Sequence, residues 1–291
     1  MLEKQNQKEC IFSLVSALIV VLCTSTGIVM NLTTLYDENF DHMGIQTFCM
    51  FTVLSNLLVA VGMGLVIPYT IDGLRKHYFH LPNWLITFLL AGSTSVTLTF
   101  LVSLFILSPF KGFVLIFTGS RFFLHAICPI LSFIAFSFFI SDHYINYSEC
   151  LLALLPVFIY VSLYYLMVVL IGEEKGGWND FYGLATYVPA WIPVVLNLPV
   201  TFGITCLLRY FHNRSFLRLR EATVRDEYSE DYLKSEIIYL ARQNAADDQP
   251  HSDIVIPRRF IKFLIENTDS DKTVRDACIM YLNQFLDNTK Y

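Results

Sequence analysis

Residues 44–68 read GIQTFCMFTVLSNLLVAVGMGLVIP, an apolar run without a charged residue. A bilayer core of about 30 Å needs about 20 apolar residues in one helix, so this run is long enough to cross a membrane. Six such runs are present: 11–31, 44–68, 84–108, 121–141, 150–172 and 184–209. The sequence therefore predicts an all-α polytopic membrane protein, a six-transmembrane-helix bundle over 10–209. The short loops predict helices packed in sequence order.

The composition agrees with a membrane protein and divides the chain in two. Of the 291 residues, 55% are hydrophobic and 15% are charged, whereas soluble domains carry about 25% charged residues. Residues 1–209 hold 8 Lys/Arg and 11 Asp/Glu, and residues 210–291 hold 12 and 14. The net charge of −5 without a basic block argues against nucleic acid as a partner. The composition excludes a soluble enzyme and a DNA-binding protein.

The distribution of Lys and Arg near the span ends predicts the orientation. With the N terminus inside, the inner segments hold eight of them and the outer segments three, namely Lys111, Arg121 and Lys175. This count predicts a cell-membrane protein with both termini in the cytoplasm. Residues 210–291 then form a cytoplasmic helical tail, in which the apolar pattern after Pro250 predicts an amphipathic helical pair. The tail is either a plain appendage or a docking segment for a cytoplasmic protein.

Cysteine usage and the N-terminal run argue against three further features. The seven cysteines include no CxxC or CxxH pair, so we predict neither a metal site nor a cofactor. The run from Ile11 to Asn31 is long enough to span and is followed by no small-residue cleavage site. We therefore interpret it as a retained helix rather than a signal peptide.

Polar side chains within the spans are costly and are functional candidates by default. Thr52, Ser55 and Asn56 are spaced i, i+3, i+4 and share one helix face. His125 is the only histidine inside a predicted span. At 1.5 Å per residue, Thr52 and His125 lie about 12 Å and about 6 Å below the outer surface, in the same half of the bilayer. The alternative is that Thr52, Ser55 and Asn56 only hold helices together by hydrogen bonds.

The outer loop 176–182, GGWNDFY, is placed to fold over these residues. Its Asp180 carboxylate would then share a pocket with the Thr52 hydroxyl and the His125 imidazole. Trp178 and Tyr182 have an alternative role as interfacial aromatics, and Asp180 as a solvated loop acid.

At these residues the sequence resembles the androgen-induced and androgen-dependent multi-pass membrane hydrolases and their uncharacterised six-pass relatives in bacteria. The family threonine follows an aromatic or aliphatic pair early in the second span, which is similar to Phe51-Thr52. The family histidine opens a later span ahead of a proline, which is similar to His125 with Pro129. The family's aromatic loop is similar to Trp178–Tyr182, although its proline is missing here. The resemblance covers about residues 10–209 and implies hydrolysis of fatty acid esters of hydroxy fatty acids by a threonine nucleophile and a histidine.

The resulting hypothesis is an integral membrane lipid-ester hydrolase with an acyl-Thr52 intermediate and His125 as base and then acid. Asn56, one turn below Thr52, is predicted to donate to the oxyanion, and Asp180 to orient His125. The substrate is a membrane lipid or acyl ester. The alternative is a non-enzymatic membrane protein: a lipid or small-molecule carrier, or a scaffold whose tail binds a cytoplasmic partner.

Overall fold

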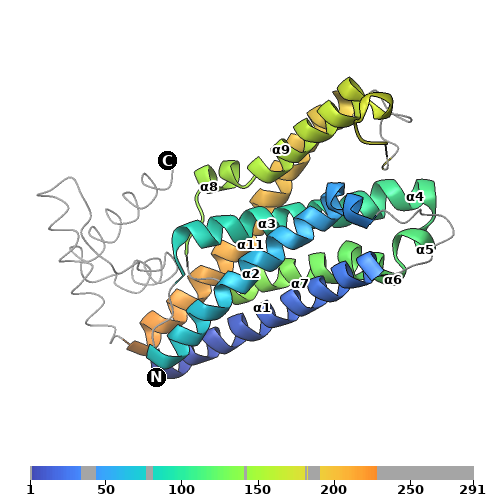
Figure 1. Ribbon diagram of the computed structural model, residues 1–291. Coiled ribbons are helices and arrows are strands. Elements are labelled where there is room, and N and C mark those ends of the chain that lie inside the picture. The colour runs from blue at the N-terminus through green and yellow to red at the C-terminus, as the bar shows by residue number, and fades with distance from the viewer. Residues whose placement is uncertain are drawn as a thin grey trace, which may run out of the picture. The chain divides into compact units, whose positions relative to one another are not determined.

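The computed structural model describes residues 2–33, 44–76, 81–140, 143–180, 182 and 191–227. Within these residues the chain is helical and contains no strand (Figure 1). The all-α prediction is therefore confirmed for this part of the chain. The chain divides into two compact units, Gln7–Asn213 and the combination of Met1–Asn6 with Arg214–Tyr291. The predicted helical pair after Pro250 lies outside the described residues.

The helices have the following order and bounds: α1 Leu2–Thr33, η1 Gly44–Cys49, α2 Phe51–Lys76, α3 Asn83–Val102, η2 Ser103–Leu107, α4 Ser108–Lys111, α5 Phe113–Ile116, α6 Gly119–Phe122, η3 Phe123–Ile127, α7 Cys128–Ile134, η4 Ala135–Phe139, α8 Tyr147–Leu152, α9 Leu155–Tyr164, η5 Tyr165–Ile171, η6 Glu173–Lys175 and α11 Trp191–Glu227. The elements η1 and η6 are 3-10 helices, and η2, η3, η4 and η5 are π-helical turns.

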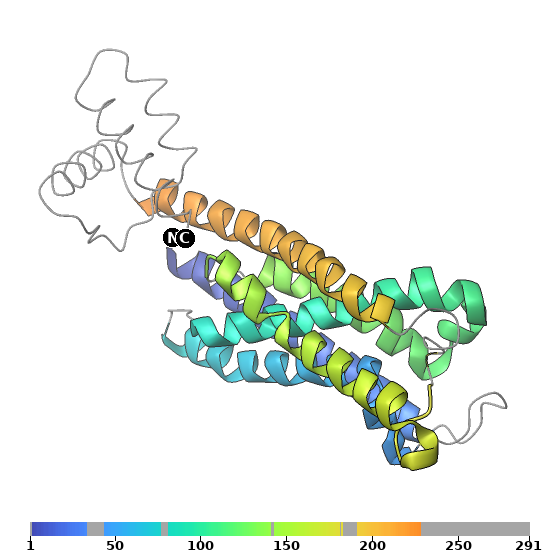
Figure 2. The same cartoon turned by 90° about the horizontal axis from the view of Figure 1, so that it is seen from above.

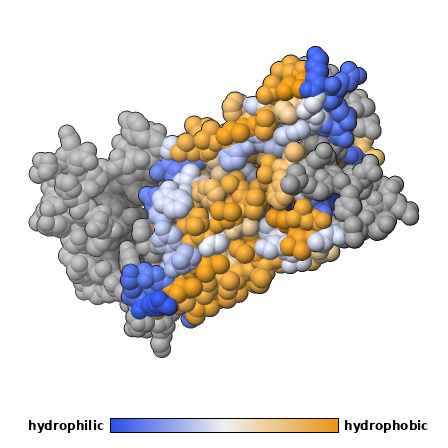
Figure 3. All heavy atoms as spheres, in the orientation of Figure 1, coloured by the Kyte–Doolittle hydropathy of each residue, from blue (hydrophilic) through white to orange (hydrophobic). Residues whose placement is uncertain are grey.

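Five helical stretches are long and apolar enough to cross a membrane: Cys10–Thr33, Phe51–Lys76, Asn83–Lys111, Gly119–Phe139 and Tyr147–Ile171. They overlap the first five predicted runs. The second span begins at Phe51 rather than at residue 44, because Gly44–Cys49 form the 3-10 helix η1, so Thr52 lies at the start of its span and not eight residues into it. The sixth run, 184–209, begins outside the described residues and continues into α11, so the count of six stays a prediction. On the face drawn in Figure 3, apolar residues cover the middle and hydrophilic residues gather at its ends. Five apolar helices and this surface are what a membrane-embedded protein requires.

The helix α3 lies at the centre of the unit Gln7–Asn213. In its span, 67% of the apolar segment is buried. The helix α2 packs closely against it because Gly92 has no side chain; a Cβ atom there would lie 3.1 Å from the Val59 Cα. On another side of α3, Thr94 Oγ1 lies 3.2 Å from Thr205 Oγ1 of α11. Figures 1 and 2 show α3 between α2 and α11.

The helix α1 packs against the fourth span, Gly119–Phe139, which the prediction of packing in sequence order did not anticipate. A Cβ atom at Gly27 would lie 2.8 Å from Leu124 Cδ2. Near the other end of α1, the Ser13 hydroxyl donates to the Phe139 carbonyl at 2.5 Å, and the rings of Phe12 and Phe139 stack. Contacts of small and hydroxyl residues, rather than connection length, decide which helices pair here.

The fifth span, Tyr147–Ile171, lies at the periphery, with only 6% of its apolar segment buried. The segment that leads into this span is bound to α11 by hydrogen bonds to the backbone of Ile145. The Ile145 carbonyl accepts from Arg209 Nε at 2.8 Å and from Asn213 Nδ2 at 2.9 Å, and Asn213 Oδ1 accepts from the Ile145 amide at 2.9 Å. The connection before α8 is therefore fixed by side chains rather than by burial of the helix.

Candidate functional site

Thr52 is the second residue of α2 and is buried, with 7% of its surface exposed. The 3-10 helix η1 leads into α2, and the Val53 and Leu54 amides both donate to the Met50 carbonyl at 3.1 Å. The hydroxyl of Thr52 therefore lies at the beginning of a helix, where backbone amides have no intrahelical acceptor.

His125 lies in the π-helical turn η3 and is also buried, with 8% of its surface exposed. Its Nδ1 atom lies 3.0 Å from the Ile116 carbonyl of α5. A carbonyl only accepts hydrogen bonds, so Nδ1 carries the hydrogen in the neutral ring and Nε2 is the basic nitrogen. The Ile116 carbonyl thus fixes the tautomer and the orientation of the ring, as the orienting group of a general base does.

Pro129 accounts for the backbone geometry around His125. In the π-turn the Cys128 amide donates to the Phe123 carbonyl. The next bond in this pattern would join the Leu124 carbonyl to the amide of residue 129, but proline has no N–H. The Leu124 carbonyl is therefore left without a backbone donor in this register, inside a buried region where each unpaired group is costly.

Asn56 supplies that donor and joins the two halves of the site. Its Nδ2 atom donates to the Leu124 carbonyl at 3.0 Å and to the Thr52 carbonyl at 2.7 Å. One side chain thus connects the backbone of Thr52 to the residue immediately before His125. The structure brings the predicted Thr52, Asn56 and His125 into one buried region through this amide.

The predicted oxyanion role of Asn56 does not follow from this arrangement. Both hydrogens of an amide nitrogen are used here, one for each carbonyl. The Oδ1 atom is buried without a hydrogen-bond partner, but it cannot donate. Donation to an oxyanion would require one of the two bonds to break.

Ser55 takes part in helix packing. Its hydroxyl donates to the Thr52 carbonyl at 3.1 Å and lies 3.0 Å from Thr99 Oγ1 on α3. This is the hydrogen-bonding role that the sequence analysis gave as the alternative for the hydroxyl residues of this face. Thr52 and His125 themselves share no hydrogen bond in the structure, although both belong to its described part.

The predicted loop reaches the site through Tyr182. The Tyr182 hydroxyl accepts a hydrogen bond from the Phe51 amide at 2.8 Å. Burial raises the pKa of the Tyr182 phenol, whereas hydrogen bonds with Tyr160 and with the backbone and side chain of Thr52 oppose the shift. Tyr182 is therefore a direct neighbour of the Thr52 hydroxyl and not only an interfacial aromatic.

Asp180 and Trp178 lie elsewhere in the same loop. The Asp180 carboxylate accepts a hydrogen bond from the Tyr164 hydroxyl. His125 is oriented by the Ile116 carbonyl instead of by Asp180, contrary to the predicted role of that carboxylate. The position of Trp178 is fixed by its backbone amide, which donates to the Met167 carbonyl at 3.2 Å.

Tyr160 and Tyr164 are site residues that the sequence analysis missed. The Tyr160 hydroxyl donates to the Cys49 carbonyl at 2.9 Å, just before α2 begins, and the Tyr160 ring lies 4.9 Å from that of Phe51. The ring centroids of Tyr164 and Tyr182 lie 5.6 Å apart. The usable signal was the i, i+4 spacing of two tyrosines in a span, because a buried phenol needs a hydrogen-bond partner.

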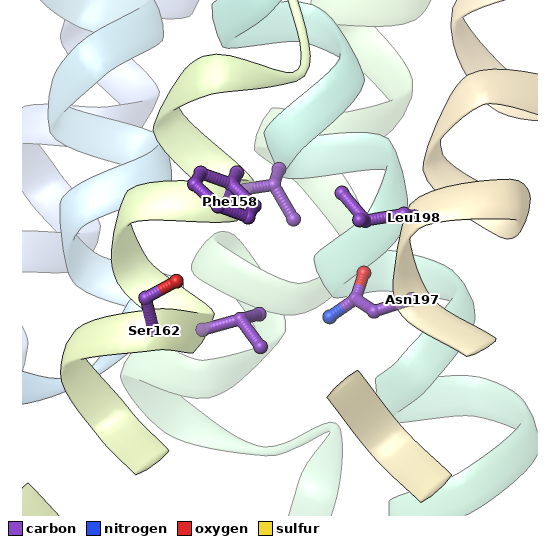
Figure 4. Close-up of a pocket in the computed structure, with 6 residues that line it drawn as sticks. Phe158, Ser162, Asn197 and Leu198 are labelled. Atoms are coloured by element: carbon purple, nitrogen blue, oxygen red, sulfur yellow. The ribbon is translucent and has the colours of Figure 1, made fainter. Parts of the chain in front are cut away.

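Two other regions that contain polar side chains lie on α9, α11 and α8. A small pocket between α9 and α11 is lined by Val157, Phe158, Val161, Ser162, Asn197 and Leu198 (Figure 4). In Figure 4 the Asn197 side chain points toward α9, and its Oδ1 accepts from Thr201 Oγ1 at 2.9 Å. Near the start of α8, His143 Nε2 lies 3.1 Å from Glu149 Oε1. Within the described residues, no three His, Cys, Asp or Glu side chains gather to hold a metal ion.

The fold and the site define a class of protein: a chain that is helical throughout its described residues, with apolar helices of membrane-spanning length and a buried threonine–asparagine–histidine group. No family model, curated protein or solved structure matches the chain, so known proteins do not narrow this class further.

Proposed function

We propose that the protein is an integral membrane lipid-ester hydrolase in which Thr52 is the nucleophile and His125 is the base. The observation that carries this proposal is a pair of hydrogen bonds from Asn56 Nδ2. One goes to the Thr52 carbonyl and the other to the carbonyl of Leu124, the residue before His125. The resemblance to the threonine hydrolase family leads to the same pair. In the proposed topology six helices cross the cell membrane, both termini are cytoplasmic, and the site lies in the outer half of the bilayer.

The proposed reaction uses the tautomer that Ile116 selects. The Thr52 oxygen attacks the ester carbonyl carbon while its proton passes to Nε2 of His125. The C–O bond of the ester then breaks, the leaving alcohol takes the proton from His125, and an acyl-Thr52 ester remains. Water, deprotonated by His125, then attacks the acyl carbon, the bond from that carbon to the Thr52 oxygen breaks, and Thr52 takes the proton back from His125 as the fatty acid is released. Nδ1 of His125 keeps its hydrogen bond to the Ile116 carbonyl throughout.

A fluorophosphonate probe tests the nucleophile directly. We expect the purified protein to be labelled, and the Thr52→Ala and His125→Ala variants to lose both labelling and hydrolysis of a detergent-solubilised acyl ester. The double variant should be no worse than either single variant, because the two groups act as a unit. Equal labelling of wild type and Thr52→Ala, or no labelling of folded wild type, would exclude the proposal.

Ser55→Ala is the matched control because it removes a hydroxyl from the same helix face. We expect this variant to be near wild type in activity, since the Ser55 hydroxyl is bonded to Thr52 O and Thr99. Thr52→Ser should keep part of the activity, because a hydroxyl remains. An inactive Ser55→Ala together with an active Thr52→Ala would identify Ser55 as the nucleophile instead.

The second candidate function is a carrier of a lipid or small molecule, in which the small pocket between α9 and α11 would have to widen to take the ligand. The pocket is an apolar space with a single amide, Asn197, directed toward α9 (Figure 4). A carrier would bind a fluorescent fatty acid in detergent with an affinity that Asn197→Leu weakens and Thr52→Ala leaves unchanged. Loss of fatty acid binding in Thr52→Ala would favour the hydrolase.

A further inference from the structure

The loop that carries Tyr182 is folded back on the end of the fifth span. The Trp178 amide donates to the Met167 carbonyl at 3.2 Å, and the Gly177 amide donates to the Gly172 carbonyl at 2.9 Å. A Cβ atom at position 177 would collide with the Met167 and Gly172 backbones, so only glycine fits there. Gly172 and Gly176 also have positive φ angles, 73° and 85°. The return of the loop toward α2 is therefore set by glycine backbone geometry.

The chemistry proposed above needs a hydrogen-bond donor for the oxyanion that forms when Thr52 attacks an ester. Removing one such donor typically costs about 100- to 1,000-fold in kcat. The Asn56 amide already donates both of its hydrogens to carbonyl groups. The Ser55 hydroxyl is engaged with the Thr52 carbonyl and with Thr99. Neither neighbour on α2 is placed to be the donor.

Tyr182 has the required position. Its hydroxyl oxygen accepts the Phe51 amide at 2.8 Å and is a hydrogen-bond neighbour of the Thr52 side chain, so its single hydrogen has only to turn from its resting partner to the oxyanion that forms at Thr52. A phenol whose oxygen accepts an amide hydrogen at a helix N terminus has its negative charge stabilised there, which strengthens its own O–H as a donor. Tyr160 packs beside it, with its hydroxyl fixed on the Cys49 carbonyl.

We propose that the Tyr182 hydroxyl is the oxyanion donor of the Thr52 site, a role that rests on the hydrolase function proposed above. As the Thr52 oxygen bonds to the carbonyl carbon, the electron pair of the C=O bond moves to the carbonyl oxygen. The Tyr182 O–H donates a hydrogen bond to that oxygen and keeps its proton. The proton from Thr52 goes to His125, and the oxyanion collapses to expel the alcohol. Tyr182 is thereby a catalytic residue on an outer loop, outside the helices that carry the nucleophile and base.

The test compares Tyr182→Phe with two matched phenol deletions. Tyr165→Phe removes a hydroxyl from η5 that makes no hydrogen bond with the described residues, and it should behave as wild type. Tyr164→Phe breaks the contact with Asp180 and so reports on placement of the loop. We expect Tyr182→Phe to lower kcat for a detergent-solubilised acyl ester about 100- to 1,000-fold with little change in KM. It should also slow fluorophosphonate labelling.

Incorporation of 3-fluorotyrosine at position 182 keeps the phenol and changes only its acidity. A donor role predicts that kcat changes with this acidity, whereas a purely structural role does not. Unchanged kcat in both Tyr182→Phe and the fluorotyrosine protein would overturn the assignment, as would an equal loss in Tyr164→Phe and Tyr182→Phe. Labelling that does not depend on Thr52 would instead exclude the hydrolase itself, so the two failures are distinguishable.

Discussion

At the start of α2, the Asn56 amide supplies a hydrogen bond that the backbone cannot make. Pro129 leaves the Leu124 carbonyl without a backbone donor in the π-turn, and Asn56 Nδ2 donates to it at 3.0 Å. The same nitrogen donates to the Thr52 carbonyl. Asn56 is therefore best described as a positioning residue, which acts on the chemistry by fixing Thr52 and His125 relative to each other.

We predict that Asn56→Ala lowers the free energy of unfolding by about 1–3 kcal/mol, because it leaves the Leu124 carbonyl buried without a donor. Ser55→Ala is the control, since the Thr52 carbonyl keeps Asn56 as its donor in that variant. Thermal unfolding of the detergent-solubilised variants measures the difference. If Asn56→Ala were as stable as Ser55→Ala, the amide would not be holding these two segments together.

Among the helices, the close approach of the α3 backbone to the α2 backbone depends on Gly92. A Cβ atom at Gly92 would lie 3.1 Å from the Val59 Cα and 3.3 Å from its backbone nitrogen, and backbone atoms cannot rotate away. Small residues allow this kind of contact between membrane helices, where packing replaces the hydrophobic effect as the driving force.

Gly92→Leu should destabilise the protein by about 1–3 kcal/mol or more, because α2 and α3 must separate to accept the side chain. Gly64→Leu provides the comparison, since a Cβ atom there meets nothing within 4 Å. Both variants exchange glycine for leucine in apolar helices, so differences in helix propensity cancel. Equal melting temperatures for the two variants would contradict the close contact at Gly92.

The contact between α11 and the fourth span contains a buried histidine. Both ring nitrogens of His212 lie 2.9 Å from carbonyl oxygens, Nδ1 from Phe136 and Nε2 from His143, and the ring stacks on Phe136. Burial lowers the pKa of His212 from 6.5 to about 4, although the two carbonyl groups and Glu149 favour the charged ring. Desolvation outweighs these contacts, so the folded protein keeps this histidine neutral at pH values where the unfolded chain protonates it, and the neutral ring donates to only one of the two carbonyl groups.

The sign of the resulting pH dependence follows from the lowered pKa. Below about pH 6.5 the unfolded state binds a proton that the folded state does not, so stability falls as the pH approaches 4, by up to about 3 kcal/mol. His212→Gln should flatten the dependence of melting temperature on pH between these values. His143→Gln is the control for the neighbouring His143–Glu149 pair. An equally flat dependence of melting temperature on pH in His143→Gln would assign the pH effect to that pair instead of to His212.

The sequence predicted the spans well and their pairing poorly, for a physical reason. Runs of apolar residues fix the length of a span, and five of them are helices of that length. A helix that is apolar on all sides, however, has no preferred face, so periodicity does not tell which helices touch. The contact of α1 with the fourth span instead depends on Gly27 and Ser13, and single small residues give little warning in a sequence.

The candidate site was predictable to a similar degree. Thr52, Asn56 and His125 stood out because polar groups are rare inside spans. The bond from Asn56 to Leu124 required knowing that Pro129 would leave a carbonyl unpaired in a π-turn, and the register of that turn is set by the packing of the folded chain. The Tyr182 contact required the path of a loop whose shape depends on glycine φ angles.

For the whole molecule, the proposed orientation places the beginning of α2 outside and its end inside. Lys76 closes α2 with an exposed side chain, and Lys175 lies in the loop after the fifth span. The eight-to-three excess of Lys and Arg on the proposed inner side sets this direction.

We predict that a cysteine at position 175 reacts with an impermeant maleimide added to intact cells, whereas a cysteine at position 76 reacts only after permeabilisation. Native cysteines are blocked beforehand or replaced in the background used for both. Position 175 serves better than 177, where a side chain collides with the backbone. The opposite labelling pattern would invert the topology and place Thr52 in the inner half of the membrane.

The π-turn at His125 has a consequence for how the chain tolerates insertions and deletions. In an α-helix, deleting one residue turns everything that follows by about 100° and scrambles the faces of the helix. A π-turn holds one more residue than an α-turn, so deleting a single residue from Phe123–Ile127 removes the wide turn and leaves the flanking helices in phase. Deletion of one codon from this segment should therefore keep the packing of the fourth span but displace the imidazole of His125.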